Sequence, residues 1–228
     1  GEVRRGVPGG SPLRGPEYET IASTGSDCGI DDLPAIAKAN ELCQAYGLDT
    51  ISCGSSIAFA MECVAKGILN KDDLDGLDLS FGNAPAMVEM VRRIAMREGL
   101  GDLLAEGVAR ASKQLGPEAE ALALHVKGQE IPMHEPRLKQ GMGLGYAISP
   151  TGADHCHNIH DNLYQSQGPA LEALKDLGII EPLAATDLSP AKVRMLIYSS
   201  AWEHLLNSLV FCNFVGLGRD RINLGRSF

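Results

Sequence analysis

Helix start and stop signals recur along this sequence, and they constrain its fold more than any other feature. Asp31 or Asp32 can cap a helix that has Pro34 in its first turn and Gly47 as its stop. The remaining apolar periodicities predict helices at about 55–66, from Pro85 to Gly99, from Asp102 to Gly116 and at about 169–177. A last helix is predicted from Ser189, with Pro190 at its first position, to about Val210. A short strand or helix is possible at 18–23, and the pattern over 121–126 does not decide but could form a short strand.

Strands and helices do not alternate in this pattern, and neither a dinucleotide-binding glycine motif nor a P-loop motif is present. The sequence therefore predicts a mainly α, multihelical fold without a central parallel sheet. The close glycine spacing over 141–146 further suggests either close helix packing or a tight backbone approach.

Composition narrows the function classes. Apolar residues make up 44% of the chain and charged residues 21%, which is ordinary for a folded protein. The 29 acidic and 20 basic side chains give a formal net charge of −9, which argues against a nucleic-acid partner. We expect a cytoplasmic protein without membrane contact, because no apolar run reaches the roughly 20 residues of a membrane span and the first residues lack the apolar stretch of a signal peptide.

Six cysteines are present, but none forms a C-x-x-C pair. We expect reduced thiols rather than disulfides or a self-contained metal motif. Residues 1–14 are rich in glycine and proline and are expected to form a loop. Together with the absence of a clear stop after Cys212, this loop suggests a piece of a longer protein.

Half of the histidines lie between Asp154 and Asp161. If this stretch is helical, His157 and Asp161 share one face, and His157, His160 and a carboxylate could bind a metal ion. The alternative is a polar segment at a helix start that uses its histidines for hydrogen bonds.

Two carboxylates, Glu17 and Glu19, lie in a segment that we expect to be extended, so they would point to opposite sides. A buried one could serve as a general base, whereas the alternative is two solvated loop carboxylates. Asp49 or Ser52 is expected to cap the helix after Gly47, although this turn could also present its carboxylate to a polar ligand.

A polar loop is expected over 127–137, because its two prolines disfavour a helix there. Arg137, beside Glu135 or Glu130, is expected to have a structural rather than a catalytic role.

Seven ordered motifs between Gly15 and Phe214 resemble the tungsten-dependent aldehyde ferredoxin oxidoreductases. They are GPEYET, AN-x-L-C-x-x-x-GLDTIS, IAFAMEC, REGLGDLLAEGVARA, HVKGQEIPMHEPR, TGADH and LVFCNF. The resemblance implies that residues 1–228 are the family's C-terminal helical region, built as two intertwined helical subdomains. The N-terminal pterin domain and the C-x-x-C-x-x-x-C stretch that supplies three ligands of a [4Fe–4S] cluster are not in this sequence.

The activity that this resemblance implies is the oxidation of an aldehyde to a carboxylic acid, with ferredoxin as the electron acceptor. The implied cofactors are a tungstopterin and a [4Fe–4S] cluster, neither of which we expect this chain to bind alone. The implied partners are the substrate, ferredoxin, the protein's own N-terminal domain and a second copy in a homodimer.

The resemblance also assigns roles to matched residues. Glu19 matches the glutamate that activates water, and His155 matches the histidine beside the tungsten, so both are expected to face one cavity while Glu17 points away. Four residues match pterin contacts, namely Leu48, Asp49, His157 and Asn213. Cys212 matches the fourth ligand of the cluster, so Asp49 is expected at the wall of that cavity and Cys212 at its deep end.

Several positions depart from the family pattern, among them Gln44, Thr151 and Asn207. These departures leave open a related class, such as the benzoyl-CoA reductase subunits. Two further alternatives are a helical module without catalytic activity and a zinc or iron enzyme built on His155, His157 and His160.

Overall fold

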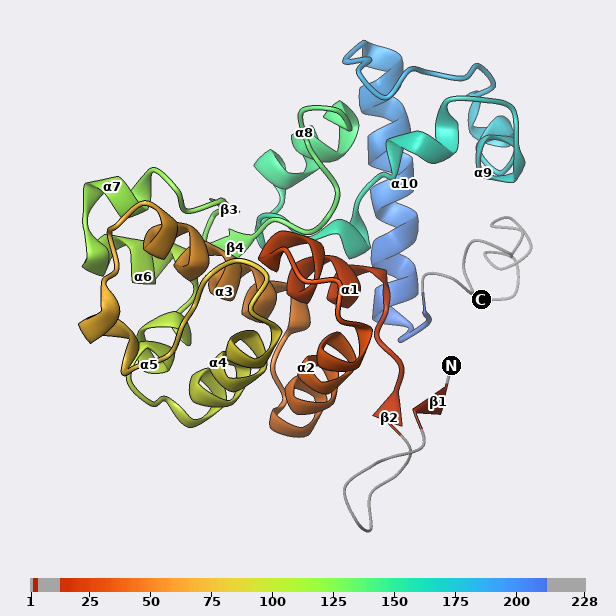
Figure 1. Ribbon diagram of the computed structural model, residues 1–228. Coiled ribbons are helices and arrows are strands. Elements are labelled where there is room, and N and C mark those ends of the chain that lie inside the picture. Colours follow the sequence, from red (N-terminus) through yellow and green to blue (C-terminus); the bar gives the residue numbers. More distant parts are fainter. Residues whose placement is uncertain (1, 4–12, 213–228) are drawn as a thin grey trace. The chain divides into compact units, whose positions relative to one another are not determined.

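The computed structural model describes residues 2–3 and 13–212. The chain divides into two compact units, Gly1–Met133 and His134–Phe228, each a continuous segment (Figure 1). Helices dominate both, and the described strands form two short antiparallel pairs, β1 (Glu2–Val3) with β2 (Leu13–Arg14) and β3 (His125–Val126) with β4 (Gln129–Glu130). The mainly α prediction is confirmed, but residues 1–14 contain paired strands where a loop was expected.

The first unit is built around one buried helix. Its helices are α1 (Tyr18–Thr24), η1 (Ser26–Cys28), α2 (Leu33–Tyr46), α3 (Thr50–Ala65), η2 (Lys71–Leu74), α4 (Ala84–Met96), α5 (Leu100–Leu104), α6 (Val108–Leu115) and α7 (Pro117–Glu120). Helix α3 contacts α1, α2, α4, α5 and α6, while α2 and α4 lie side by side (Figure 1). The core consists of small and medium apolar side chains, such as Ile57, Met61 and Met90.

Helix α1 approaches α3 closely at Gly54. A Cβ atom at this position would lie 2.6 Å from the backbone carbon of Ser23, so only glycine fits without a shift. The hydroxyl of Ser23 also donates to the carbonyl oxygen of Thr50 at 2.9 Å. These contacts fix α1, and with it the side chains of its first turn, against the core of the first unit.

Two helix boundaries differ from those that the sequence predicts. Helix α3 begins at Thr50 rather than near 55, because an Asp49 carboxylate oxygen accepts the backbone N–H of Ser52 at 2.7 Å. The single helix expected from Asp102 to Gly116 is divided into α5 and α6 at Gly107, where φ is +79°. In the segment from 121 to 126, which the sequence left undecided, the strand β3 covers only the last two residues.

The second unit packs short helices against one long helix. Its elements are α8 (Gln140–Ile148), η3 (His155–His157), η4 (Asp161–Tyr164), α9 (Pro169–Glu172), η5 (Lys175–Leu177) and α10 (Pro190–Ser208). The expected start of the last helix is confirmed, since the Ser189 side chain caps it and Pro190 opens it. An apolar cluster that includes Ile159, Tyr164 and Met195 forms the core.

A fully buried ion pair ties three elements of the second unit together. The ammonium of Lys192 on α10 lies 2.6 Å from a carboxylate oxygen of Asp161 on η4. The same carboxylate accepts the backbone N–H groups of Gly141 at 3.3 Å and Met142 at 2.9 Å, at the start of α8. Asp161 therefore supplies the N-terminal cap that α8 lacks in its own sequence.

The glycines of α8 allow this close approach. A Cβ atom at Gly141 would lie 2.6 Å from an Asp161 carboxylate oxygen, and one at Gly145 would overlap the side chain of Asn158. The close approach expected over 141–146 is thus confirmed.

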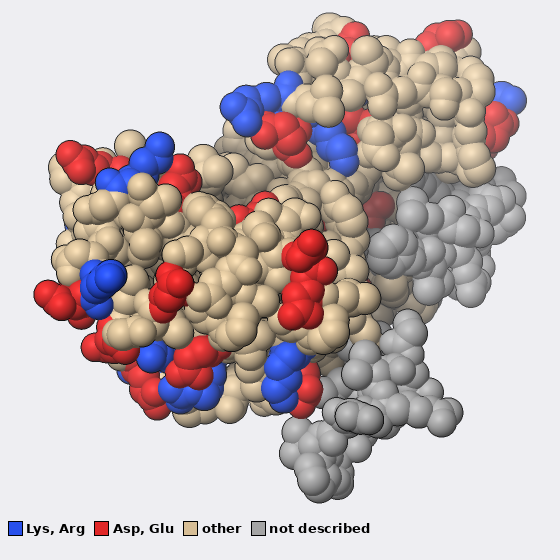
Figure 2. Space-filling view, in the orientation of Figure 1, with Lys and Arg blue, Asp and Glu red and all other residues tan. Residues whose placement is uncertain are grey.

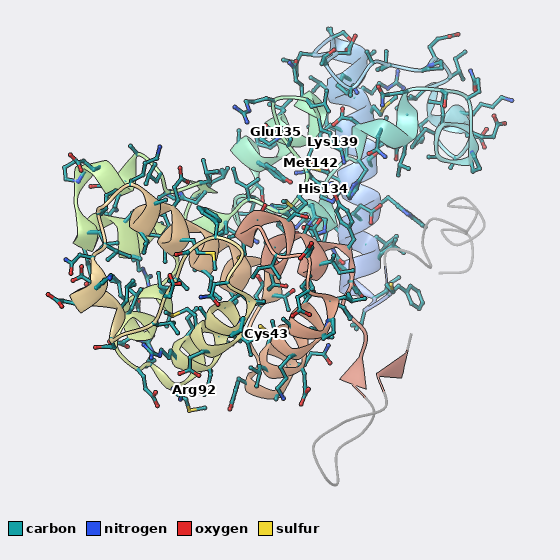
Figure 3. The ribbon with its side chains drawn as sticks, viewed as in Figure 1. Cys43, Arg92, His134, Glu135, Lys139 and Met142 are labelled. Carbon is teal, nitrogen blue, oxygen red and sulfur yellow. The ribbon has the colours of Figure 1, made fainter. Side chains whose placement is uncertain are left out.

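Charged side chains of both signs are interspersed on the visible face of the molecule (Figure 2). Some form networks on the first unit, where Arg92 pairs with Glu89 at 2.8 Å and with Glu98 at 2.6 Å (Figure 3 labels Arg92). Among the described residues, no helix combines the length and the hydropathy that crossing a bilayer requires. All six cysteines are free thiols, as predicted, with Cys156 and Cys212 exposed.

Candidate active site

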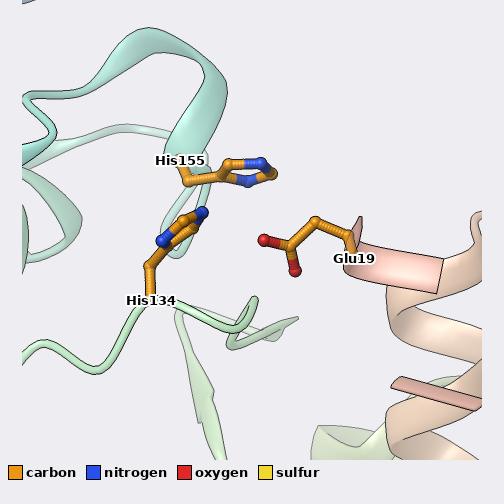
Figure 4. A group of neighbouring side chains, drawn as sticks. All are labelled: Glu19, His134 and His155. Atoms are coloured by element: carbon orange, nitrogen blue, oxygen red, sulfur yellow. The ribbon is translucent and has the colours of Figure 1, made fainter. Parts of the chain in front are cut away.

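Glu19 lies in the first turn of α1 in the first unit (Figure 4). This turn is helical, so the expectation of an extended segment is wrong. Glu17 occupies the N-cap position with extended backbone and is exposed, whereas Glu19 is half-buried. The two carboxylates thus differ in exposure, and their divergence remains a prediction.

The Glu19 carboxylate is held by a long-range backbone contact. One of its oxygens accepts the N–H of Met133 at 2.9 Å, although 114 positions separate the two residues. A hydrogen bond from a backbone amide fixes the direction of a carboxylate more firmly than solvent does. Glu19 is therefore an oriented acceptor.

A second carboxylate, Asp27, lies within electrostatic reach of Glu19. The pKa of Asp27 is raised to about 6, first by burial and second by the negative charge of Glu19. Two carboxylates that influence each other in a partly buried setting are typical of proton-transfer sites. No local pattern in the sequence marks Asp27, because only folding brings η1 against α1.

The second unit gathers three imidazole rings. His155 belongs to η3, which Asp154 caps by accepting the N–H of Cys156 at 2.7 Å. The ring of His134 lies 4.9 Å from that of His155, between ring centroids, and 4.8 Å from that of His160. Figure 4 shows the rings of His134 and His155. His134 lies in one of the matched motifs, HVKGQEIPMHEPR, but the sequence alone suggests no role for it.

The setting of the three rings keeps His160 neutral. Its pKa is lowered to about 4, mainly by burial and then by electrostatic interactions with His134, Lys139 and His155. Lys139, at the start of α8, lies with its ammonium nitrogen 2.8 Å from Nδ1 of His134 (Figure 3). The cluster thus combines a cation with imidazoles, of which at least one stays uncharged at neutral pH.

His157 does not belong to this cluster. Its Nδ1 lies 3.0 Å from an Asp154 carboxylate oxygen, its Nε2 lies 3.0 Å from the Ser149 hydroxyl, and its ring stacks on His204 at 4.7 Å. The hypothesis of one helical face shared with Asp161 is wrong, because η3 and η4 are separate turns and Asp161 pairs with Lys192.

These contacts weigh against a metal site built on His155, His157 and His160, because both ring nitrogens of His157 have protein partners. In the described part of the second unit, the potential ligand atoms of Asp154, His155 and Cys156 lie within 4.8 Å of one another, close enough to hold a metal ion. That set consists of consecutive residues with an exposed thiol, and no ion defines it.

The remaining predicted site residues fall in three places. Asp49 is exposed and caps α3, as the helix-turn hypothesis expected, and Leu48 is half-buried against the core of the first unit. Cys212 is exposed, four positions after the end of α10. Asn213 lies outside the described residues. The cofactor roles of these four residues remain predictions.

Two acidic side chains of the 127–137 loop have structural partners. Arg137 pairs with Glu135 at 2.8 Å, in keeping with the expected structural role. Glu130 instead accepts the N–H of Val108 at 2.8 Å, at the start of α6.

Comparisons with known proteins agree on one family. The model of aldehyde ferredoxin oxidoreductase domains 2 and 3 matches residues 2–226. The tungsten-containing aldehyde ferredoxin oxidoreductase of Pyrococcus furiosus is 37% identical over 96% of this chain and 34% of its own length, and that of Thermococcus kodakarensis is 38% identical over 90% and 32%. The chain therefore spans about a third of these curated relatives.

A more distant relative is the WOR-like subunit of an aliphatic sulfonate oxidoreductase of Pyrococcus furiosus, which is 33% identical over 78% of the chain and 29% of its own length. Among solved structures, the active site complex BamBC of benzoyl coenzyme A reductase with 1,5-dienoyl-CoA aligns with a TM-score of 0.49 and 29% identity. That alignment covers 58% of this chain and 21% of the other.

Proposed function

Because this chain belongs to the aldehyde ferredoxin oxidoreductase family, we propose that it forms the helical part of a tungsten enzyme that oxidises aldehydes to carboxylic acids and passes the electrons to ferredoxin. The family match over residues 2–226 carries this proposal. Since the chain spans about a third of its curated relatives, the rest of the protein supplies what these residues lack, including an N-terminal domain.

The reaction needs a base and a hydrogen-bond donor from the protein. An aldehyde and water give a carboxylate, three protons and two electrons, so a water molecule must lose a proton as its oxygen attacks the carbonyl carbon. Glu19 is the proposed base, because its carboxylate is half-buried and is oriented by the N–H of Met133. Asp27, with its raised pKa, is a nearby group that could share the proton.

His155 is the proposed donor to the carbonyl oxygen, where negative charge develops during the attack. A base and a donor can act on one carbonyl group only if both lie within about one substrate's width of it. We therefore infer that Glu19 and His155 serve the same reaction centre in the complete enzyme.

The residues proposed for the cofactors have suitable chemistry. Asp49 offers an exposed carboxylate, fixed in direction by its bond to Ser52, and pterin rings carry N–H groups that a carboxylate can accept. Cys212 offers an exposed thiol, as a cluster ligand must. When bound, the metal and its pterins accept the electrons of the reaction. Leu48, His157 and Asn213 complete the proposed cofactor contacts.

The test uses the full-length enzyme and compares turnover with cofactor content. Glu19→Gln should abolish aldehyde oxidation while tungsten and iron content stay unchanged, because the amide keeps the shape of the side chain but is not a base. Glu17→Gln is the matched control and should leave turnover unchanged, since Glu17 is exposed. Cys212→Ala should lower iron content instead.

Turnover that survives Glu19→Gln would refute the assigned base. Because one relative is a subunit of an aliphatic sulfonate oxidoreductase, the same enzyme should be assayed with an aldehyde and with a short alkyl sulfonate. Oxidation of the sulfonate alone would overturn the proposed substrate class.

A further inference from the structure

The contact between Lys139 and His134 determines where the imidazole carries its proton. The ammonium nitrogen lies 2.8 Å from Nδ1 of His134, and both residues are half-buried in the second unit. A lysine ammonium has three N–H donors and no acceptor. Because lysine ordinarily holds its proton about four pH units above imidazole, the proton of this contact stays on the lysine.

It follows that Nδ1 of His134 accepts this hydrogen bond. An imidazole that accepts at Nδ1 carries its single proton on Nε2 and is neutral. With Nδ1 occupied by this contact, the ring of His134 offers its N–H at Nε2. Its ring is adjacent to two others, 4.9 Å from that of His155 and 4.8 Å from that of His160.

We propose that His134 is a second hydrogen-bond donor at the reaction centre beside His155, with its proton kept on Nε2 by Lys139. The inference rests on the proposed function, because it assigns the donor to the carbonyl oxygen of the same substrate. Sites that stabilise a developing oxyanion commonly use two donors, and a donor already oriented costs no reorganisation during the reaction. Lys139 is a positioning residue that acts through His134.

Nuclear magnetic resonance of the 228-residue chain tests the proton position directly. The ¹⁵N shifts of the His134 ring at neutral pH should show a protonated Nε2 and an unprotonated Nδ1. Lys139→Met should convert His134 to a mixture of tautomers, because the donor to Nδ1 is lost. Lys175→Met is the matched control, since Lys175 is exposed and pairs only with Glu172 in the structure described. A proton on Nδ1, or on both nitrogens, would overturn the proposal.

Kinetics of the full-length enzyme test the role of that proton. His134→Phe should lower kcat by about 10²-fold or more at unchanged tungsten and iron content, which is the usual cost of losing one such donor. His134→Gln should recover at least tenfold of this loss, because its side-chain amide places an N–H near the position of Nε2. Lys139→Met should lower kcat more than it changes KM.

An undiminished kcat in His134→Phe, or a glutamine variant no better than the phenylalanine variant, would refute the donor role. These outcomes differ from a failure of the proposed function, which would appear as a wild-type enzyme that does not oxidise aldehydes. In that case the resonance experiment still decides whether His134 carries its proton on Nε2, as the contact with Lys139 implies.

Discussion

Replacing Lys192 by methionine should destabilise the second unit strongly. The change keeps the length and most of the volume of the side chain but removes the ammonium that lies 2.6 Å from Asp161. Both side chains of this ion pair have no exposed surface, so water cannot take the place of the lost cation. Removing one partner of a buried ion pair usually costs about 3–5 kcal/mol.

The lower end of that range applies here. The Asp161 carboxylate keeps the backbone N–H groups of Gly141 and Met142 as donors, so it is not left entirely without partners. We therefore expect the free energy of unfolding to fall by about 3 kcal/mol. With a urea dependence of about 1–1.5 kcal/mol per M for a unit of this size, the unfolding midpoint should fall by about 2–3 M.

Tryptophan fluorescence measures this unfolding selectively. Trp202 is the only tryptophan of the chain and lies on α10, largely buried, within the second unit. Its emission in urea therefore reports the unit that contains the ion pair, while far-ultraviolet circular dichroism reports helices of both units. A change in the fluorescence midpoint that leaves the slope unaltered indicates a change in stability rather than in the unfolded state.

Two further variants make the test specific. Lys175→Met removes a surface ion pair with Glu172 and should cost less than about 1 kcal/mol. The double variant Lys192→Met with Asp161→Asn should be more stable than Lys192→Met alone, because it no longer buries an unpaired charge. A loss of less than 1 kcal/mol in Lys192→Met, or no recovery in the double variant, would contradict this account of the ion pair.

Two other perturbations test the first unit. Burial and Glu19 raise the pKa of Asp27 to about 6, so the folded state still binds a proton that the unfolded state releases near pH 4. The free energy of unfolding should therefore fall by about 1–3 kcal/mol as the pH rises from about 4 to 6. Asp27→Asn should abolish this fall in urea titrations at a series of pH values, and an unchanged pH dependence would show that another group causes it. Asp49→Ala should cost about 1 kcal/mol, since it removes the cap that accepts the Ser52 N–H. If Asp49→Asn, which keeps an acceptor oxygen, is as unstable as the alanine variant in the same assay, the cap is not the cause.

Local sequence determined the helices that carry their own start signals. Asp32 accepts the N–H of Ala35, Ser189 accepts that of Lys192, and Gly47 takes the positive φ that ends α2. Such caps act over about three residues, so they can be identified without knowing the fold. Because these start and stop signals are local, they predict a mainly α fold correctly without any knowledge of the tertiary contacts.

Tertiary structure decided the helix starts whose caps come from distant residues. The N-terminus of α6 is capped by Glu130, 22 positions away, and that of α8 by Asp161, 19 positions from Met142. No local pattern predicts either cap, because each depends on where another element packs. The sequence accordingly predicted one helix from 102 to 116, whereas the structure has two.

The candidate site shows the same division. Its matched motifs point to Glu19 and His155 from sequence alone, because those residues lie in recognisable segments. The structure adds the partners that orient them or share their surroundings, namely the Met133 amide, the Asp27 carboxyl and the ring of His134. The Met133 amide comes from a segment far from Glu19 in the chain, and the ring of His134 from a segment 21 positions before His155. Asp27 lies on the neighbouring turn η1, which packing brings close to Glu19. Residue identity is thus a property of the sequence, whereas the direction of a carboxylate and the proton position of an imidazole depend on contacts that exist only in the folded chain.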